Sequence, residues 1–99
     1  MKQLRAESIV VRSGNHLSAT VDGETVLLDS DTSVYYGMNE VGTEVWEHLQ
    51  SPASVAEVQS RIADEYDVKE AVVAADVTEF LTDLIEVDLV EVRSMADES

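Results

Sequence analysis

The spacing of apolar side chains changes near residue 38 of the chain. In residues 16–21 every second side chain is apolar, which is the period of a strand with one buried face. We therefore expect a half-buried strand whose core-facing side chains are Leu17, Ala19 and Val21. A shorter apolar stretch, residues 8–12, precedes a Ser-Gly-Asn turn signal and predicts a further strand.

Two more strands are expected to pair with residues 16–21. Asp22-Gly23 is typical of a tight hairpin turn, because glycine adopts a positive φ without steric cost. Residues 24–28 are rich in strand-forming side chains, and after a polar turn residues 33–38 alternate again. The pattern predicts a three-stranded antiparallel sheet in which residues 33–38 form an edge.

From residue 39 onward, apolar side chains recur every three or four positions, which predicts three amphipathic helices. Asn39 is a suitable N-cap for the first helix, and Ser51-Pro52 ends it. Residues 54–57 form a Ser-x-x-Glu capping box for the second helix, and residues 67–70 repeat this spacing before the third. The predicted apolar stripe of the first helix consists of Val41, Val45, Trp46 and Leu49.

The third helix, expected to end at Asp88, has one apolar and one acidic side. Its apolar arc consists of Val73, Val77, Phe80, Leu81, Leu84 and Ile85. Its acidic residues are Asp76, Glu79, Asp83 and Glu86. Residues 89–92 then predict a short final strand.

This order of elements predicts an α+β fold that is winged helix-turn-helix-like. It would contain a three-stranded antiparallel sheet followed by three helices and a short C-terminal strand, and the N-terminal strands would form one enlarged sheet. A chain of 99 residues suits a single domain, residues 1–99. We expect its core to span about residues 16–92, with residues 93–99 as a flexible polar tail.

The net charge of −15 is concentrated in the second part of the chain. Residues 1–38 carry three basic and five acidic side chains, whereas residues 39–99 carry three basic and sixteen acidic ones. Nucleic acids and anionic membranes attract surfaces rich in Lys and Arg, so we expect neither as a partner. The acidity either keeps the surface solvated, as in salt-adapted proteins, or steers a basic peptide or protein partner.

Candidate catalytic and metal-binding patterns are weak. The chain has no cysteine, no phosphate loop and no nucleophile elbow. Its two histidines, His16 and His48, fall in separate predicted elements without ligand partners at metal spacing. The glutamates of the first helix are expected to form a solvated face. We therefore predict a protein that is not an enzyme and uses no metal or cofactor.

The remaining composition is that of an ordinary globular chain, with 44% hydrophobic residues. No apolar run is long enough to cross a membrane, and the N-terminus lacks the apolar core of a signal peptide. We therefore expect a cytoplasmic location.

The run of residues 36–49 resembles the YxLNxxGxxIWxLL segment of the PqqD-like proteins. Three later segments resemble the rest of that family pattern, in the same order: residues 54–58, 65–68 and 75–90. The resemblance covers nearly the whole chain. One departure is Val87-Asp88, where the family has a small residue and glycine, and it leaves the end of the third helix in question.

The resemblance implies a RiPP recognition element, which binds the leader of a ribosomally synthesised precursor peptide and presents it to a modifying enzyme or leader peptidase. It implies that the leader adds as a strand to residues 33–38 and lies against the third helix. On that strand and on the apolar and acidic sides of that helix, the peptide-binding residues we expect are Ser33, Val34, Tyr35, Tyr36, Gly37, Val73, Asp76, Val77, Phe80, Leu81, Asp83 and Leu84. Asp76 is the carboxylate expected to meet a leader cation, and Tyr36 is expected to be the buried tyrosine. A purely structural role for Val77, Leu81 and Leu84 stays open.

Alternative functions stay open as well. Lasso-peptide biosynthesis is favoured, and a peptide chaperone for a radical-SAM enzyme, as in PQQ-type cofactor synthesis, is the alternative within the family. A winged-helix transcription factor would need a basic recognition helix, and a module for an unrelated enzyme complex is a third class. The exposed edge strand permits either a monomer or a dimer.

Overall fold

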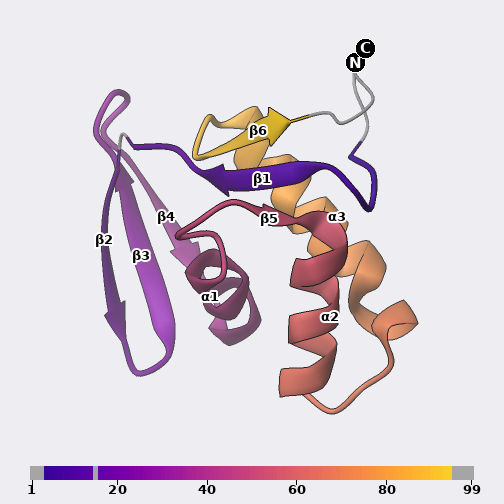
Figure 1. The fold of residues 1–99 in the computed structure, drawn as a ribbon. Coiled ribbons are helices and arrows are strands. Elements are labelled where there is room, and N and C mark those ends of the chain that lie inside the picture. Colours follow the sequence, from indigo (N-terminus) through magenta and orange to yellow (C-terminus); the bar gives the residue numbers. More distant parts are fainter. Residues whose placement is uncertain (1–3, 15, 95–99) are drawn as a thin grey trace.

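The protein is described by a computed structural model that covers residues 4–14 and 16–94. The elements in chain order are β1 (Ile9–Arg12), β2 (His16–Val21), β3 (Glu24–Asp29), β4 (Val34–Met38), α1 (Glu40–Glu47), β5 (Ala53–Ser54), α2 (Val55–Glu65), α3 (Glu70–Glu86) and β6 (Val90–Ser94). The sheet of β2, β3 and β4 lies on one side of the molecule and α2 and α3 on the other, with α1 between them (Figure 1). This arrangement confirms the predicted fold class.

The first predicted sheet is present, with strands β2, β3 and β4 in that spatial order and all neighbours antiparallel. Its hairpin turn is the predicted one: Asp22 has φ 52° and Gly23 has φ 81°, both in the left-handed region that such a turn requires. Strand β3 continues one residue beyond the prediction, to Asp29, and β4 begins at Val34.

The predicted buried face of β2 is wrong. Leu17 and Val21 are 65% and 67% exposed, and Ala19 is exposed as well. Leu17 pairs with Leu28 across the sheet, whereas Ser18 pairs with the fully buried Leu27. Opposite residues of paired strands share a face, so the polar side of β2 is the one turned toward the core. Alternation identifies the two faces of a strand, but other elements decide which face is covered.

A second three-stranded sheet, with the order β5-β1-β6, was not predicted. Strand β1 forms its centre and is antiparallel to both neighbours, with Val10 opposite Ala53 and Val92. The N-terminal strands therefore form two separate sheets instead of one enlarged sheet. Residues 93 and 94, which we expected in the flexible tail, belong to β6, and the rest of that tail lies outside the described residues.

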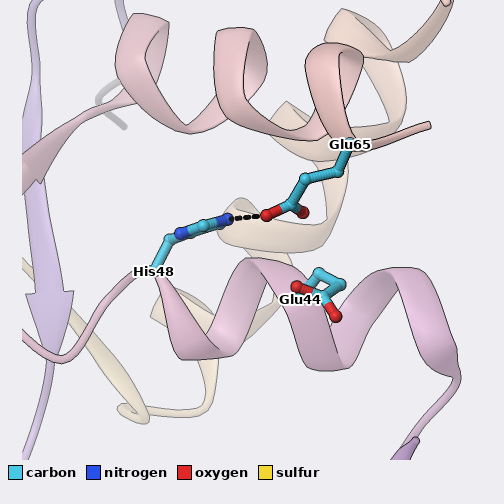
Figure 2. Close-up of side chains that lie close together, drawn as sticks. All are labelled: Glu44, His48 and Glu65. Carbon is cyan, nitrogen blue, oxygen red and sulfur yellow. Dashed lines mark hydrogen bonds and ion pairs between the residues drawn. The ribbon is translucent and has the colours of Figure 1, made fainter. Parts of the chain in front are cut away.

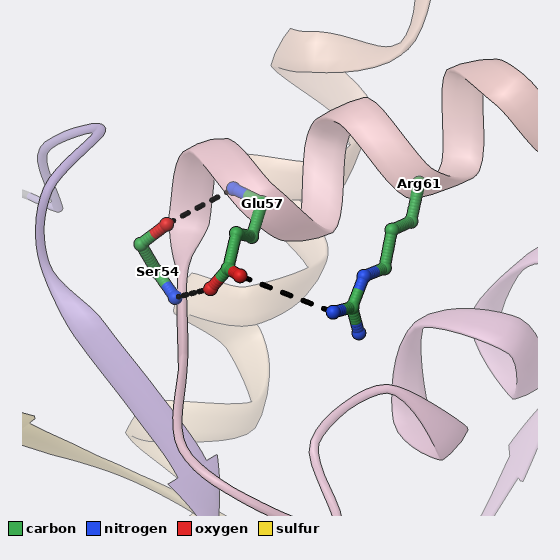
Figure 3. Close-up of polar contacts among 3 residues, drawn as sticks. All are labelled: Ser54, Glu57 and Arg61. Atoms are coloured by element: carbon green, nitrogen blue, oxygen red, sulfur yellow. Dashed lines mark hydrogen bonds and ion pairs between the residues drawn. The ribbon is translucent and has the colours of Figure 1, made fainter.

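Two of the three predicted helix caps are confirmed. The Asn39 side chain accepts a hydrogen bond from the Gly42 N–H at 2.8 Å. At the start of α2, the Ser54 hydroxyl accepts from the Glu57 N–H, and the Glu57 carboxylate accepts from the Ser54 N–H, both at 3.0 Å (Figure 3). Arg61 lies one turn further along, 3.9 Å from the same carboxylate. These local bonds explain why α1 and α2 begin where the sequence places them.

The predicted capping box at residues 67–70 is wrong. Lys69 is the N-cap of α3, and its side chain makes no capping hydrogen bond. Asp67 instead terminates α2 with φ 55°, and the following N–H, of Val68, donates to the Ala63 carbonyl at 3.0 Å. A left-handed residue with this bond is the usual way to close a helix C-terminus.

The end of α3 has the same construction. The helix ends at Glu86, two residues before the predicted end, and Asp88 has φ 64°. The Leu89 N–H donates to the Leu84 carbonyl at 2.9 Å, and both of these side chains are buried. Asp88 therefore occupies a left-handed position of the kind that glycine usually fills, and it turns the chain into β6.

The core lies where α1, α2 and α3 meet the inner faces of the two sheets, and Trp46 is its largest side chain. The Arg12 guanidinium lies 4.5 Å from the centroid of the Trp46 ring, and the His16 ring meets it edge-on at 4.9 Å. Arg12 also donates from Nε to the Trp46 carbonyl at 3.0 Å. These contacts join β1 and the start of β2 to α1, and they confirm the predicted core position of the tryptophan.

Candidate functional site

Strand β4 has one edge without a backbone partner among residues 4–14 and 16–94. Its other edge pairs with β3 over its whole length, from Val34 opposite Asp29 to Met38 opposite Thr25. In an antiparallel ladder alternate residues direct their N–H and C=O groups to opposite sides, so half of the backbone groups of β4 face outward. Such an edge can pair with another extended chain.

A hollow of about 340 Å³ lies between α1 and α3. Its lining residues are Asn39, Val41, Gly42, Val45, Val73, Asp76, Val77 and Phe80. Most of these are apolar, and Asp76 is the only charged residue among them. Strand β4 ends at Met38, and the next residue, Asn39, already lines the hollow. The free edge and the hollow are therefore consecutive along the chain.

Gly42 of α1 lies against the Phe80 ring of α3 at this hollow. A Cβ atom at this position would lie 3.1 Å from Cζ of Phe80 and 3.3 Å from Oδ1 of Asn39. The Phe80 side chain is half-buried and packs against the core from α3. The lack of a side chain at residue 42 leaves room for this ring, so Phe80 forms a wall of the hollow.

The structure places the predicted apolar residues of the third helix, and Asp76, in the hollow, in the core or, for Val77, in both. Val73, Asp76, Val77 and Phe80 line the hollow. Leu81 and Leu84 are buried in the hydrophobic core, where they contact the other elements of the protein instead of an open surface.

The remaining predicted residues lie outside the hollow. Asp83 is exposed on α3, and Ser33 lies in the turn before β4, where its N–H donates to the Asp29 carbonyl at 2.8 Å. The other four, Val34, Tyr35, Tyr36 and Gly37, belong to β4. Of the two tyrosines, Tyr36 packs against the core and Tyr35 is 69% exposed, as predicted.

One wall of the hollow was missed by the sequence analysis. The groove was expected between residues 33–38 and the third helix, but α1 supplies Val41, Gly42 and Val45. Val41 was assigned to the apolar stripe of this helix, but its side chain is 39% exposed and lines the hollow. The sequence did contain one indication of this wall: Val41 lies at the margin of the apolar stripe, beside the helical glycine Gly42.

A group of polar side chains joins α1 to α2 on another part of α1. Nε2 of His48 and Oε2 of Glu65 lie 3.2 Å apart, and Glu44 lies one helical turn before His48 (Figure 2). Burial raises the pKa of Glu44, and the neighbouring Glu65 carboxylate raises it further. The fold therefore brings two carboxylates to His48 that the sequence analysis did not place beside it, and the prediction that no metal is bound stays a prediction.

Comparison with known proteins gives a family match and two similar structures. The family described as Coenzyme PQQ synthesis protein D (PqqD) matches residues 24–90. The solved structure of "TbiB1 in Complex with the TbiA(beta) Leader Peptide" is 32% identical, with a TM-score of 0.76, and the match covers 86% of this chain and 99% of TbiB1. No curated protein matches the sequence.

The second structure is the PqqD truncation of Methylobacterium extorquens PqqCD, described as a functional and stand-alone RiPP recognition element. It is 14% identical, with a TM-score of 0.73, and the match covers 89% of this chain and 94% of that one. At this identity the likeness establishes a shared fold. The region matched by the family includes β3, β4 and all three helices, and it therefore contains the free edge and the hollow.

Proposed function

Because the chain belongs to the PqqD family, we propose that it binds the leader segment of a ribosomally synthesised precursor peptide, as a RiPP recognition element. The observation that carries this proposal is the unpaired edge of β4 leading directly into the apolar hollow between α1 and α3. TbiB1, which is 32% identical, was solved with a leader peptide bound.

In the proposed complex the leader adds to β4 as an extra strand. Backbone hydrogen bonds to the outward N–H and C=O groups of β4 give affinity with little dependence on leader sequence. Selectivity comes from the hollow, where an aliphatic or aromatic leader side chain is buried among Val45, Val73 and Phe80. Each fully buried anchor contributes about 1.5–3 kcal/mol. Ordering of the leader offsets part of this gain, so a Kd between sub-micromolar and micromolar is expected.

Asp76 adds an electrostatic preference to this site. It is the only charged residue that lines the hollow, and further carboxylates of α3, among them Glu79 and Asp83, are exposed nearby on the same helix. A leader with a Lys or Arg close to its apolar anchor would therefore be favoured. Helix α3 contains no Lys or Arg between Glu70 and Glu86, which opposes its use as a DNA recognition helix.

The proposed role is binding without catalysis, in the cytoplasm, followed by presentation of the precursor to a modifying enzyme or leader peptidase. Among such systems we favour lasso-peptide biosynthesis over service to a radical-SAM enzyme. The greater similarity to TbiB1 than to the PqqD truncation supports a leader-binding protein of the TbiB1 kind. The described helices include none that is long and apolar enough to span a membrane.

Fluorescence anisotropy tests the proposal. The probe is a labelled synthetic leader of the precursor peptide encoded beside the gene for this protein, with a scrambled peptide of the same composition as its control. We expect saturable binding with a Kd of about 0.1–10 μM for the leader and at least tenfold weaker binding of the scrambled peptide. Equal binding of the two peptides, or none of either, would contradict the proposed function.

The downstream role has a separate test. The co-encoded peptidase should remove the leader from the precursor faster when this protein is present, and the effect should saturate near the measured Kd. An unchanged rate would contradict presentation to that enzyme, but it would not affect the conclusion on leader binding.

A further inference from the structure

The cluster of Glu44, His48 and Glu65 has the composition and spacing of a metal-binding site. Glu44 lies on α1 and His48, four residues later, is the C-cap of that helix in a helical conformation, so their side chains lie on the same face. Glu65 is the last residue of α2 and points toward them from the facing helix (Figure 2). One ligand atom from each of the three side chains lies within 4.8 Å of the others.

We propose that Glu44, His48 and Glu65 bind a divalent transition-metal ion, with Zn²⁺ as the best-fitting ion. Zinc–nitrogen and zinc–oxygen bonds are about 2.0–2.2 Å long, which places neighbouring ligand atoms of a tetrahedral site roughly 3.3 Å apart. Nε2 of His48 and Oε2 of Glu65 are already 3.2 Å apart. A carboxylate oxygen of Glu44 lies within 4.8 Å of the ligand atoms of the other two residues and would be the third ligand.

The donor set selects the class of ion. An imidazole nitrogen together with two carboxylate oxygens suits zinc and its transition-metal neighbours, whereas Mg²⁺ and Ca²⁺ prefer oxygen ligands alone. Three protein ligands leave the fourth tetrahedral position to water, as in an open zinc site. Bound zinc would therefore be held by this chain with moderate strength and remain accessible to exchange.

The charge of the cluster also favours a cation. A divalent cation bound between the two carboxylates would offset their negative charge. Within residues 4–14 and 16–94, no lysine or arginine is ion-paired with Glu44 or Glu65; the nearest basic residue on α2, Arg61, is paired with Glu57 at 3.9 Å. Glu44 and Glu65 also bring two carboxylates together between α1 and α2, and a cation bound between them would reduce their repulsion.

Bound metal would hold α1 against the C-terminal end of α2. Helix α1 supplies Val41, Gly42 and Val45 to the hollow, so the ion would stabilise one wall of the proposed leader site without touching it. Because the ion binds the folded protein only, it should raise the melting temperature in proportion to the logarithm of its concentration. The metal site does not depend on the leader-binding proposal.

Isothermal titration calorimetry of the tag-free, chelator-treated protein with ZnCl₂ tests the site. We expect one equivalent of Zn²⁺ per chain with a micromolar Kd, a rise in melting temperature, and at least tenfold weaker binding of Mg²⁺. His48→Ala and Glu65→Gln should each weaken zinc binding at least tenfold. Glu47→Gln, an exposed glutamate of α1 outside the cluster, is the matched control and should bind zinc normally.

Circular dichroism verifies that the variants remain folded, and Glu65→Gln keeps the test valid if His48→Ala does not fold, because Glu65 is exposed. Zinc binding that is equally strong in all variants would assign it to the acidic surface in general and overturn the proposal. Lack of zinc binding by the unmodified protein, or equal affinity for Mg²⁺, would overturn it as well.

Discussion

The protein has two three-stranded sheets. One is hydrogen-bonded to other segments of the chain, and the other leaves an edge strand exposed. In the sheet β5-β1-β6, the central strand is tied to other segments beyond its own ladder: the Arg12 N–H donates to the Leu49 carbonyl at 3.1 Å, and the Ser13 N–H to the Leu89 carbonyl at 2.9 Å. In the sheet β2-β3-β4, β3 buries one face, with Thr25, Leu27 and Asp29, whereas β2 and most of β4 are exposed.

This difference separates a sheet that holds the protein together from one that can accept a partner. Strand β1 connects the loop after α1, the start of α2 and the segment after α3, so its hydrogen bonds are used within the chain. The outer edge of β4 has no such internal use among the described residues, and β4 continues into the hollow through Asn39. The proposed binding surface therefore lies where the fold leaves backbone groups unpaired beside an apolar depression.

The largest expected effect comes from placing a charge in the hollow. Val73→Asp should weaken leader binding roughly 100-fold, because the new carboxylate removes an apolar contact and is poorly solvated beside a buried anchor. Val72→Asp is a matched control, since Val72 is the neighbouring residue on α3, is 63% exposed and does not line the hollow. Anisotropy titrations measure both variants. Similar losses of affinity in the two variants would show that the hollow is not part of the binding surface.

A smaller effect is expected from reversing the charge of the hollow. Asp76→Lys should weaken a leader that carries a cation near its anchor by about fivefold to tenfold at low salt, and by less at 0.5 M salt, where screening reduces the interaction. Glu79→Lys makes the same change on an exposed part of α3 outside the hollow. If both variants lose affinity equally, the acidity acts as a general steering field and Asp76 has no special role.

The stability of the folded protein should depend on pH through His16. Burial lowers the pKa of His16 below its ordinary value of 6.5, and the Arg12 charge lowers it further. The folded protein therefore favours the neutral ring that packs on Trp46. Its contribution to stability is present above pH 6.5 and is lost as the pH falls toward the lowered pKa.

Urea unfolding of the protein and of His16→Gln at pH 7.5 and pH 5.5 measures this contribution. The free energy of unfolding should decrease more between these pH values in the unmodified protein than in the variant. An equal decrease in both would show that His16 does not couple proton uptake to unfolding.

The smallest expected effect concerns the turn from α3 into β6. Asp88→Gly should raise the free energy of unfolding by about 0.5–1 kcal/mol, because glycine adopts the left-handed conformation without the strain of a side chain. Leader affinity should not change, since Asp88 lies outside the hollow. Thermal unfolding and anisotropy check the two parts. A lower stability would mean that the aspartate side chain supports this turn.

Much of the fold could be predicted because its signals are local. The Asn39 cap, the Ser54–Glu57 capping box and the Asp22-Gly23 turn each depend on a few consecutive residues, and all three have the expected geometry. The family resemblance pointed to β4 and α3, and four residues of α3 do line the hollow.

The remaining features depend on contacts between distant segments. Strand β5 has only two residues and exists because Ala53 and Ser54 pair with β1. The side of β2 that faces the core follows from its partner β3, and Val41 lines a hollow because α3 lies opposite. His48 and Glu65 are 17 residues apart and meet only when α1 packs on α2. Periodicity within one segment carries no information about such pairings.

The central claim is that another chain pairs with the outer edge of β4, and amide hydrogen exchange tests it most directly. Strand β2 is the opposite edge of the same sheet and provides an internal control. On addition of saturating leader, the account predicts slower exchange by roughly tenfold or more at amides of residues 34–38, with little change at residues 16–21. Unchanged exchange in β4, or equal protection of both edges, would contradict the claim.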